Sequence, residues 1–235
     1  MPLKQVDQQD ILSIHRVRER LVKQRTALSN QARGLLLEYG ITVPLGIANV
    51  RKKLPEVTDL NYDKLTPMAK ELFSGLYDEL CDIEIKIKQQ EKRLQAIYDL
   101  DYRCQLIGTI NGVGLMTATA MIASIGDGKE FEDGRQLSAW LGLVPRQHST
   151  GGKDRLFGIS KRGDKYLRSL LVHGARSELW ASKRKSHQET RFTRWAKHLE
   201  ERRGTNKAIV AMANKKARAI WAMLNTGEVY RVETV

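Results

Sequence analysis

The spacing of aliphatic residues near the start of the chain is the feature that most restricts its fold. Large aliphatic side chains recur at every seventh position, at Ile14, Leu21, Leu28 and Leu35. A seven-residue repeat keeps one face of an α-helix in register with a partner helix. Residues 8–39 are therefore predicted to form one long helix that ends near Gly40.

A second long helix is predicted over residues 67–99. Thr66 suits the N-cap position, because its hydroxyl can accept from a free backbone N–H, and Pro67 suits the first helical position. The apolar stripe of this helix consists of Leu72, Leu76, Leu80, Ile83, Ile87, Leu94 and Ile97. Two striped helices fit an antiparallel hairpin within one chain or a coiled coil between chains, and the heptad spacing leaves both open.

The segment between these two helices is expected to be a loop. Residues 41–65 contain Pro44, Gly46 and Pro55, which interrupt regular structure. The long helices and this loop make up a helical-hairpin or coiled-coil segment over residues 1–101.

From residue 102 onward, glycine becomes frequent and the apolar spacing shortens, so a compact domain is expected over 102–235. Its helices are predicted at about 115–125, 135–141, 163–180 and 206–224. The stretch 142–160, rich in Gly, Ser and Thr, is expected to be a loop with room for a short hairpin. The predicted fold class is therefore mainly α.

Positive charge is concentrated in one part of the chain. Residues 146–221 hold 20 Lys and Arg against 6 Asp and Glu, a net charge of +14, whereas the remaining residues hold 20 against 21. A basic region beside a neutral one is typical of a surface that binds a polyanion, most often nucleic acid. The alternative is a basic surface that only aids solubility, and the segregation of the charge favours nucleic acid.

Composition excludes several classes of protein. No apolar run approaches the roughly 20 residues that cross a bilayer, and the first residues lack the apolar core of a secretory signal. The two cysteines, Cys81 and Cys104, form neither a disulfide framework nor a metal-binding spacing. Asp154 follows Lys153 where a phosphate-binding P-loop has Ser or Thr, which excludes that type of ATPase. The composition indicates a cytoplasmic protein with reduced thiols and no membrane partner.

A glycine-containing turn precedes one predicted helix. Residues 110–114, Ile-Asn-Gly-Val-Gly, resemble the turn of a helix-hairpin-helix element over 106–126. Gly112 and Gly114 would let the backbone turn tightly, and free N–H groups at the start of the next helix can hold a phosphate oxygen. A packed pair of helices without a ligand explains the same residues. Because residues 111–125 contain no Lys or Arg, both interpretations stay open.

The stretch 142–155 combines glycines, hydroxyls and cations. Its hydroxyl and cationic side chains are Ser149, Thr150, Arg146, Lys153 and Arg155. A serine that attacks a phosphodiester needs an exposed hydroxyl, cations that balance the phosphate's charge and a route for its proton. His148 is adjacent to the serine, although neighbouring side chains on an extended segment point apart. From these residues alone, a polar turn explains the stretch better than catalysis.

Two further basic clusters lie in the predicted basic helices over 161–224. The first stands at a predicted helix start and consists of Lys161, Arg162, Lys165 and Arg168. Cations at a helix amino terminus oppose the helix dipole, so a bound anion would relieve an unfavourable interaction. The second is the run 180–203, where Lys and Arg are interleaved with aromatic residues. That mixture suits phosphate contact with base stacking, although such aromatics are more often core residues.

Three blocks together resemble the insertion-sequence 110 family of transposases, and within it the 1111 group. They are LIGTINGVGLMTATAMIASIGD at 106–127, QLSAWLGLVPRQHSTGGKDRLFGISKRGDKYLRSLLVHGAR at 136–176 and RRGTNKAIVAMANKKARAIWAML at 202–224. Residues 9–40 also resemble the family's linker helix, so the resemblance covers nearly the whole chain. Of these blocks, the GLVPRQHSTGG…ISKRGD part is the one specific to the family.

The resemblance implies a DNA transposase or recombinase that mobilises an insertion sequence by cleaving and rejoining DNA strands. Family members have an amino-terminal RuvC-like domain whose Asp and Glu residues bind Mg²⁺, a coiled-coil segment and a carboxy-terminal domain with a serine nucleophile. The resemblance assigns the nucleophile to Ser149, with Thr150 as the alternative. It further implies a homo-oligomer formed through the long helices and, in at least some members, a structured guide RNA.

The chain departs from the family pattern at its start. It begins about where the coiled-coil segment begins, and no clustered Asp and Glu set replaces the RuvC-like domain. The sequence therefore predicts a truncated form that itself binds no cofactor, with Mg²⁺ expected only where the acidic domain is present. The alternative function is a non-catalytic module that binds nucleic acid, oligomerises and regulates an intact transposase.

Overall fold

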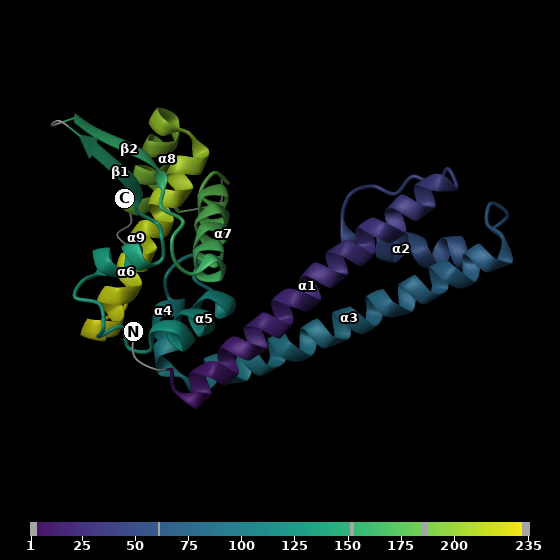
Figure 1. Cartoon of the computed structure of the whole chain (residues 1–235), viewed down its shortest axis with the longest axis horizontal. Helices are drawn as coiled ribbons and strands as arrows, with labels where there is room; N and C mark the ends of the chain where they lie inside the picture. Colours follow the sequence, from purple (N-terminus) through teal and green to yellow (C-terminus); the bar gives the residue numbers. More distant parts are fainter. Residues whose placement is uncertain (1–3, 61, 151–152, 185–187, 232–235) are drawn as a thin grey trace. The chain divides into compact units, whose positions relative to one another are not determined.

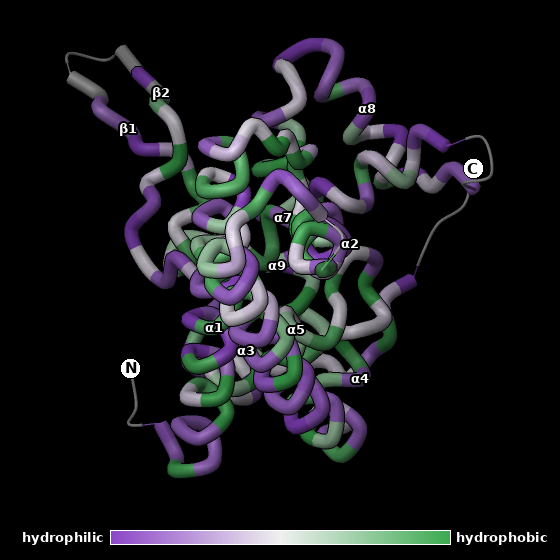
Figure 2. The backbone as a smooth tube through the Cα atoms, turned by 90° about the vertical axis from the view of Figure 1, so that its right-hand side faces the viewer, coloured by the Kyte–Doolittle hydropathy of each residue, from purple (hydrophilic) through white to green (hydrophobic). Residues whose placement is uncertain are grey.

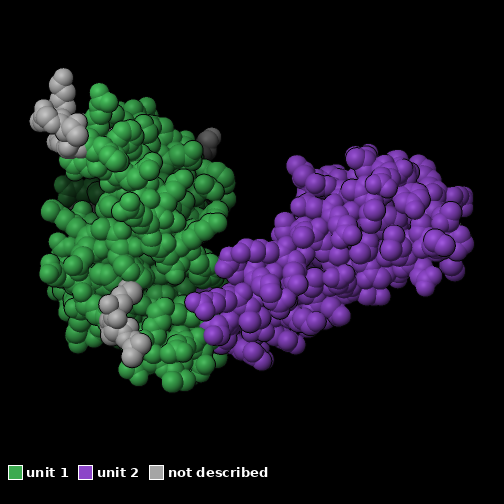
Figure 3. All heavy atoms as spheres, in the orientation of Figure 1, with its two compact units in different colours: residues 1–12, 94–235 green, residues 13–93 purple. Residues whose placement is uncertain are grey.

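The computed structural model describes residues 4–60, 62–150, 153–184 and 188–231, and it describes the backbone alone at 149, 150, 153, 154 and 156. These residues form nine α-helices and one antiparallel sheet of two strands, so the fold is mainly α, as the sequence predicts (Figure 1). They divide into two compact units, coloured separately in Figure 3. Residues 13–93 form the α1–α3 unit, and residues 1–12 together with 94–235 form the α4–α9 unit.

Helices α1 (Val6–Glu38) and α3 (Pro67–Leu100) run antiparallel in the α1–α3 unit. Arg18 Nη2 lies 2.6 Å from Glu91 Oε1, and the rings of Tyr39 and Phe73 lie 6.0 Å apart, so the start of one helix meets the end of the other. Hydrophilic and hydrophobic residues alternate along both helices in Figure 2. Their shared core includes Leu21, Leu28, Leu36, Phe73, Leu80, Ile83 and Ile87. Of the two arrangements that the heptads allow, the chain adopts the internal hairpin.

The segment 41–65, expected to be a loop, contains a helix, α2 (Ile47–Thr58), so that prediction was wrong. Val50, Leu54 and Val57 follow a helical spacing, and all three are fully buried. Pro55 lies inside the helix, where a proline costs roughly 3 kcal/mol because it removes a backbone hydrogen bond and crowds the preceding turn. Full burial of one aliphatic side chain stabilises by roughly 1.5–3 kcal/mol, so three of them outweigh the proline.

The predicted start of α3 is confirmed in detail. Ala69 N donates to Thr66 Oγ1 at 3.2 Å, so Thr66 is the N-cap and Pro67 the first helical residue. A proline is tolerated there because the first N–H groups of a helix have no partner within the helix.

Helix α9 (Thr205–Thr226) is central to the α4–α9 unit, because four other helices pack against it (Figure 1). These are α4 (Tyr102–Gly108), α6 (Gly134–Trp140), α7 (Lys165–Ala181) and α8 (Arg191–Arg203). Helix α5 (Leu115–Ile125) packs between α4 and α7, and nine of its residues are buried. Strands β1 (Pro145–Thr150) and β2 (Lys153–Ile159) complete the unit.

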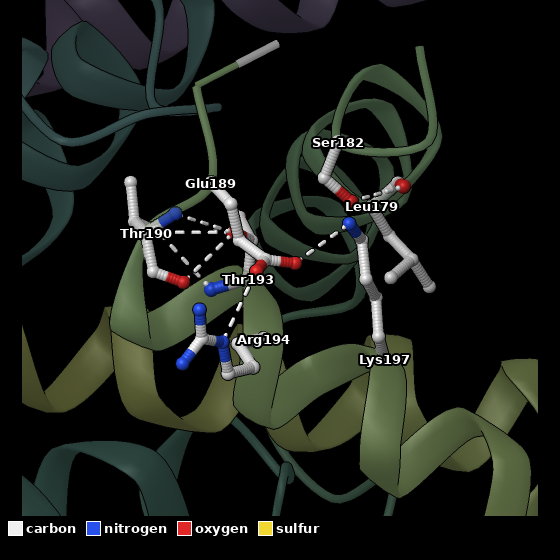
Figure 4. Close-up of polar contacts among 7 residues, drawn as sticks. All are labelled: Leu179, Ser182, Glu189, Thr190, Thr193, Arg194 and Lys197. Atoms are coloured by element: carbon white, nitrogen blue, oxygen red, sulfur yellow. Dashed lines mark hydrogen bonds and ion pairs between the residues drawn. The ribbon is translucent and has the colours of Figure 1, made fainter. Parts of the chain in front are cut away.

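The four helices predicted for this region are confirmed as α5, α6, α7 and α9, with ends within two residues of those expected. Two helices were not foreseen. Helix α4 is only seven residues long and begins at its cap, Asp101, directly after α3. Helix α8 begins with a capping box in which Thr193 N donates to Thr190 Oγ1 at 3.1 Å and Thr190 N donates to Thr193 Oγ1 at 2.9 Å (Figure 4). Threonine takes the place of the Glu or Gln by which such a box is usually recognised.

Candidate nucleic-acid interface

The stretch 142–160, expected to be a loop with room for a short hairpin, contains the β1–β2 hairpin, in which Ser149 pairs with Asp154 and His148 with Arg155. Directly opposed residues share one face of a sheet, so His148 and Arg155 lie on the same face. The His148 ring also meets the Phe157 ring edge-on, with centroids 5.5 Å apart. This face therefore presents an imidazole, a guanidinium and an aromatic ring to solvent.

Arg146 is also exposed on β1, next to an irregularity in the strand register. The side chains of Ser149, Thr150 and Lys153 lie outside the described part of the structure, so their predicted roles stay predictions. Their backbone positions put them at the end of the hairpin farthest from the helices, with Thr150 paired to Lys153.

The base of the hairpin is fixed to the turn that precedes α7. Ser160 N donates to Val144 O at 2.8 Å, and Lys161 N donates to Gly142 O at 3.2 Å. Gly142 and Gly163 both have positive φ, and a Cβ on either would collide with backbone, that of Arg162 or of Trp140 respectively. Only glycine allows this approach, so the two glycines lock the hairpin base against the turn.

This locked turn carries the first predicted basic cluster. Lys161 and Arg162 are exposed, and Lys161 adopts a left-handed φ of 55°. Lys165 is exposed one turn further on, whereas Arg168 is half-buried and donates from Nη1 to Leu141 O at 3.0 Å. Three cations therefore face solvent beside the hairpin base, and Arg168 helps to hold that base in place.

The amino terminus of α7 already has an internal acceptor. Asp164 Oδ1 accepts from Tyr166 N at 2.8 Å and from Leu167 N at 3.0 Å. A carboxylate cap satisfies these N–H groups and also offsets the helix dipole. The neighbouring cations thus need no bound anion for this helix to be stable, and a phosphate would contact their side chains more readily than the helix end.

Part of the glycine turn before α5 packs closely against α7. Gly112 has a φ of +75°, and a Cβ added to it would collide with the backbone of Gly174 in α7. Asn111 O accepts a hydrogen bond from Lys216 Nζ, and the same ammonium pairs with Glu178 Oε2 at 2.5 Å. Packing alone therefore accounts for Gly112. Gly114 differs, because a Cβ added to it would meet nothing, and it opens α5 without a side-chain cap.

The Lys216–Glu178 pair is a site feature that the sequence analysis missed. Both side chains are nearly inaccessible to solvent, with relative exposures of 2% and 5%. Burial lowers the pKa of Lys216, and the Glu178 carboxylate opposes that shift. A signal was present: Lys216 falls on the apolar stripe of α9, which includes Met212, Ala213, Ile220 and Met223. A charged residue on such a stripe indicates a buried partner.

Internal ion pairs engage several cations of the run 180–203. Glu189 accepts from Arg194 Nε at 3.0 Å and from Lys197 Nζ at 2.9 Å, and hydrogen bonds from Lys197 and Arg194 lower the pKa of Glu189 (Figure 4). Lys183 Nζ lies 2.8 Å from Glu200 Oε1. Exposed ion pairs of this kind contribute little to stability, so they remain exchangeable with phosphate contacts.

The described residues contain no group of three or more His, Cys, Asp and Glu that could hold a metal ion. A search of the same residues found no helix long and apolar enough to span a membrane.

Comparison with known proteins adds the family. Residues 104–191 match the transposase domain described as the IS116/IS110/IS902 family. Across 97% of its length, the chain is 46% identical to the transposase for insertion sequence element IS1111A of Coxiella burnetii, of which it covers 62%. Across 98%, it is 45% identical to a probable family 20 transposase of Pseudomonas aeruginosa, of which it covers 68%. This chain belongs to the IS116/IS110/IS902 transposase family.

A third relative, the transposase for insertion sequence element IS1328 of Yersinia enterocolitica, is 40% identical over 95% of the chain, which covers 65% of it. The chain thus spans about two thirds of the length of these IS116/IS110/IS902 transposases. The family domain at 104–191 contains every predicted site residue, from the glycine turn to the start of α7. The predicted resemblance is therefore confirmed at the level of the family.

Proposed function

We propose that this chain contributes the serine-dependent step of DNA strand cleavage and rejoining in transposition. In that step the Ser149 hydroxyl oxygen attacks a DNA phosphorus, and the hydroxyl proton passes to a general base. The bond between the phosphorus and the leaving DNA oxygen breaks. A phosphoserine bond then joins the protein to one DNA end. Attack by the hydroxyl of another DNA end would release the serine and reseal a strand.

The observation that carries this proposal is the anchoring of the hairpin that contains Ser149. Its base is bound backbone to backbone to the turn before α7, with Gly142 and Gly163 packed too closely to admit a Cβ. Strand transfer demands that nucleophile and phosphate meet in one geometry, and a fixed base limits the movement of the strand that supplies the nucleophile.

The cations around the hairpin support the electrostatic part of the step. Arg146, Arg155, Lys161, Arg162 and Lys165 are all exposed. Guanidinium groups bind phosphate oxygens through two parallel N–H donors, which balances the charge that builds up during attack at phosphorus. In this proposal the two arginines of the hairpin, with Lys153, hold the reacting phosphate, and the other cations hold the flanking backbone.

The partner that follows from this proposal is DNA, and the family resemblance adds a structured guide RNA and further copies of the chain as proposed partners. We also propose that a RuvC-like acidic domain with Mg²⁺ activates the hydroxyl or positions the DNA. The chain's own residues would then bind the backbone, orient the phosphate and provide the nucleophile. The Gly114 end of α5, which lacks a side-chain cap, is a further candidate for a phosphate contact.

A covalent-adduct assay tests the proposal. The chain would be mixed with labelled DNA carrying the element end, Mg²⁺ and a separately purified RuvC-like domain of a relative. Denaturing gels should show a protein–DNA adduct with the unmodified chain and with Ser169→Ala, a control serine on the exposed side of α7. Ser149→Ala should give no adduct while binding DNA nearly as well, since only one hydroxyl is lost.

Three outcomes would change the proposal. An adduct that persists in Ser149→Ala and disappears in Thr150→Ala moves the nucleophile by one residue. An adduct that survives both substitutions excludes a hydroxyl nucleophile in this hairpin. DNA binding without an adduct in any mixture supports a regulatory, non-catalytic module instead.

A further inference from the structure

A cavity of about 400 Å³ lies away from the hairpin, between the end of α4, the start of α8, the middle of α9 and the segment after α9. Its lining residues include Ile110, Phe192, Lys215, Lys216, Arg218 and Tyr230. A smaller hollow shares Phe192 and Tyr230 with it and is also lined by Asn111 and Glu178. The two hollows are therefore adjacent, and the larger one has a size that suits a small-molecule group, for which cavities of roughly 300–1,000 Å³ are typical.

One side of this cavity reaches the buried ion pair. Lys216 lines the cavity, its partner Glu178 and Asn111 line the adjacent smaller hollow, and Asn111 O accepts a hydrogen bond from Lys216. Taking an ammonium and a carboxylate out of water is costly, and nonpolar residues often fill such a place as well or better. Fixed donors and acceptors inside a cavity are the feature by which a protein recognises the polar edge of a planar ligand.

One wall of the cavity contains an aromatic ring, Phe192, and a cation, Lys215. The Phe192 and Trp195 rings stack with centroids 5.7 Å apart, and Lys215 Nζ lies 3.6 Å from the centroid of the Trp195 ring. Phe192 and Trp195 are half-buried, so part of the stack stays accessible. Aromatic faces beside Lys or Arg are the arrangement that single-stranded nucleic-acid sites use for successive bases and phosphates.

The rim carries cations that no described carboxylate neutralises. Lys215 and Arg218 are both exposed and lie one helical turn apart on α9. The pKa of Lys215 is lowered, first by partial burial and then by the charge of Arg218. Two like charges held together favour an anion between them, and a phosphate supplies one.

We propose that this cavity takes one unpaired nucleotide of DNA or RNA, with its base against Phe192 and Tyr230 and its phosphates on Lys215 and Arg218. The inference rests on the proposed function, in which the chain handles nucleic acid. It adds a second contact, remote from the cations at the start of α7: Glu178, beside the cavity, lies 13 residues beyond Lys165, a separation of about 20 Å at 1.5 Å per residue.

The test compares fluorescently labelled duplexes that differ by a single unpaired base. Each duplex is prepared fully paired and with a one-base bulge, once in DNA and once in RNA, and its affinity for the full chain is measured by anisotropy at fixed salt. The chain should bind a bulged duplex about tenfold more tightly than its paired counterpart, within the range for stacking one base. The DNA and RNA arms identify which nucleic acid supplies the nucleotide.

Variants locate the preference for the bulge. Tyr230→Ala and Phe192→Leu should abolish it, and Arg218→Gln, which alters an exposed side chain, should reduce it without risk to the fold. Arg203→Gln, an exposed cation at the end of α8, is the matched control and should keep it. Equal binding of bulged and paired duplexes by the unmodified chain, or a full preference in Arg218→Gln and Tyr230→Ala, would overturn the proposal.

The serine step and the cavity can fail separately. If the adduct forms but bulge preference is absent, only the cavity proposal falls. If bulge preference is present, also in Ser149→Ala, while no adduct forms in any mixture, the serine proposal falls and the cavity stands.

Discussion

The stability of the chain should depend on pH through a buried histidine in α1, His15. His15 has only 1% of its surface exposed. Its pKa is lowered from 6.5 to about 4, mainly because burial disfavours the charged imidazole and also because Arg18 is nearby. In the unfolded chain the same group should titrate near its ordinary value. The folded state therefore holds His15 neutral at a pH where the unfolded chain has protonated it.

The sign and size of the effect follow from that difference. The contribution of His15 to the free energy of unfolding is fully present above about pH 6.5. It is lost as the pH falls toward about 4, because the unfolded chain binds a proton that the folded chain does not. At 1.36 kcal/mol per pKa unit, lowering the pH from about 7.5 to about 5 should cost about 2 kcal/mol through His15. Most carboxylates remain ionised at about pH 5, so they contribute little to this change.

Urea unfolding at these two pH values measures the effect. The unmodified chain should lose about 2 kcal/mol more than His15→Gln, which cannot titrate in this range. His173→Gln removes an exposed histidine of α7 and should keep the full pH dependence. If His15→Gln and the unmodified chain lose the same free energy of unfolding, His15 is not the neutral buried group described here.

Three further predictions concern the α4–α9 unit. Lys216→Met or Glu178→Gln removes one partner of the buried pair and should lower the free energy of unfolding by about 3–5 kcal/mol. Replacing both residues with apolar ones should recover most of that loss, and equal losses in the single and double variants would contradict this prediction. Gly163→Ala should lower the free energy of unfolding by more than about 1 kcal/mol and speed hydrogen exchange at Ser160 N, because its Cβ would meet backbone at a positive φ. Gly158→Ala, where a Cβ would meet nothing, should have neither effect. Affinity of the chain for DNA should fall on the order of a thousandfold between about 50 and about 200 mM salt if six or more phosphates are contacted, and salt-independent binding would exclude the basic region as the binding surface.

The sequence predicts the parts of this fold that depend on local periodicity. The heptads of α1 and the cap at Thr66 give helix positions directly, because spacing and capping act within a few residues. Helix α2 was missed because Pro55 and the nearby Pro44 and Gly46 indicate a loop, whereas the apolar side chains of α2 become buried only once the chain has folded. Tertiary packing decides whether this helix forms, and a short stretch of sequence does not reveal that packing.

The candidate site likewise has a part that the sequence predicts and a part that only the folded structure reveals. The cations at 146–168 were found because they are adjacent in sequence and lie beside a hydroxyl-rich stretch. The cavity was not found from the sequence, because Ile110 is separated from Lys215 and Tyr230 by more than a hundred residues along the chain. The stripe positions of Lys216 and Glu178 were the accessible clue, but spacing alone does not say which buried charges meet.

The most direct test of the central claim is to identify the residue that carries DNA. The covalent adduct formed with the unmodified chain, Mg²⁺ and the RuvC-like domain would be digested with protease and nuclease and sequenced by tandem mass spectrometry. A nucleotide phosphate attached to Ser149, in the peptide that spans β1 and β2, is the predicted result. A phosphate on any residue outside this hairpin, or strand rejoining with no protein–DNA bond at any time point, would contradict the serine mechanism.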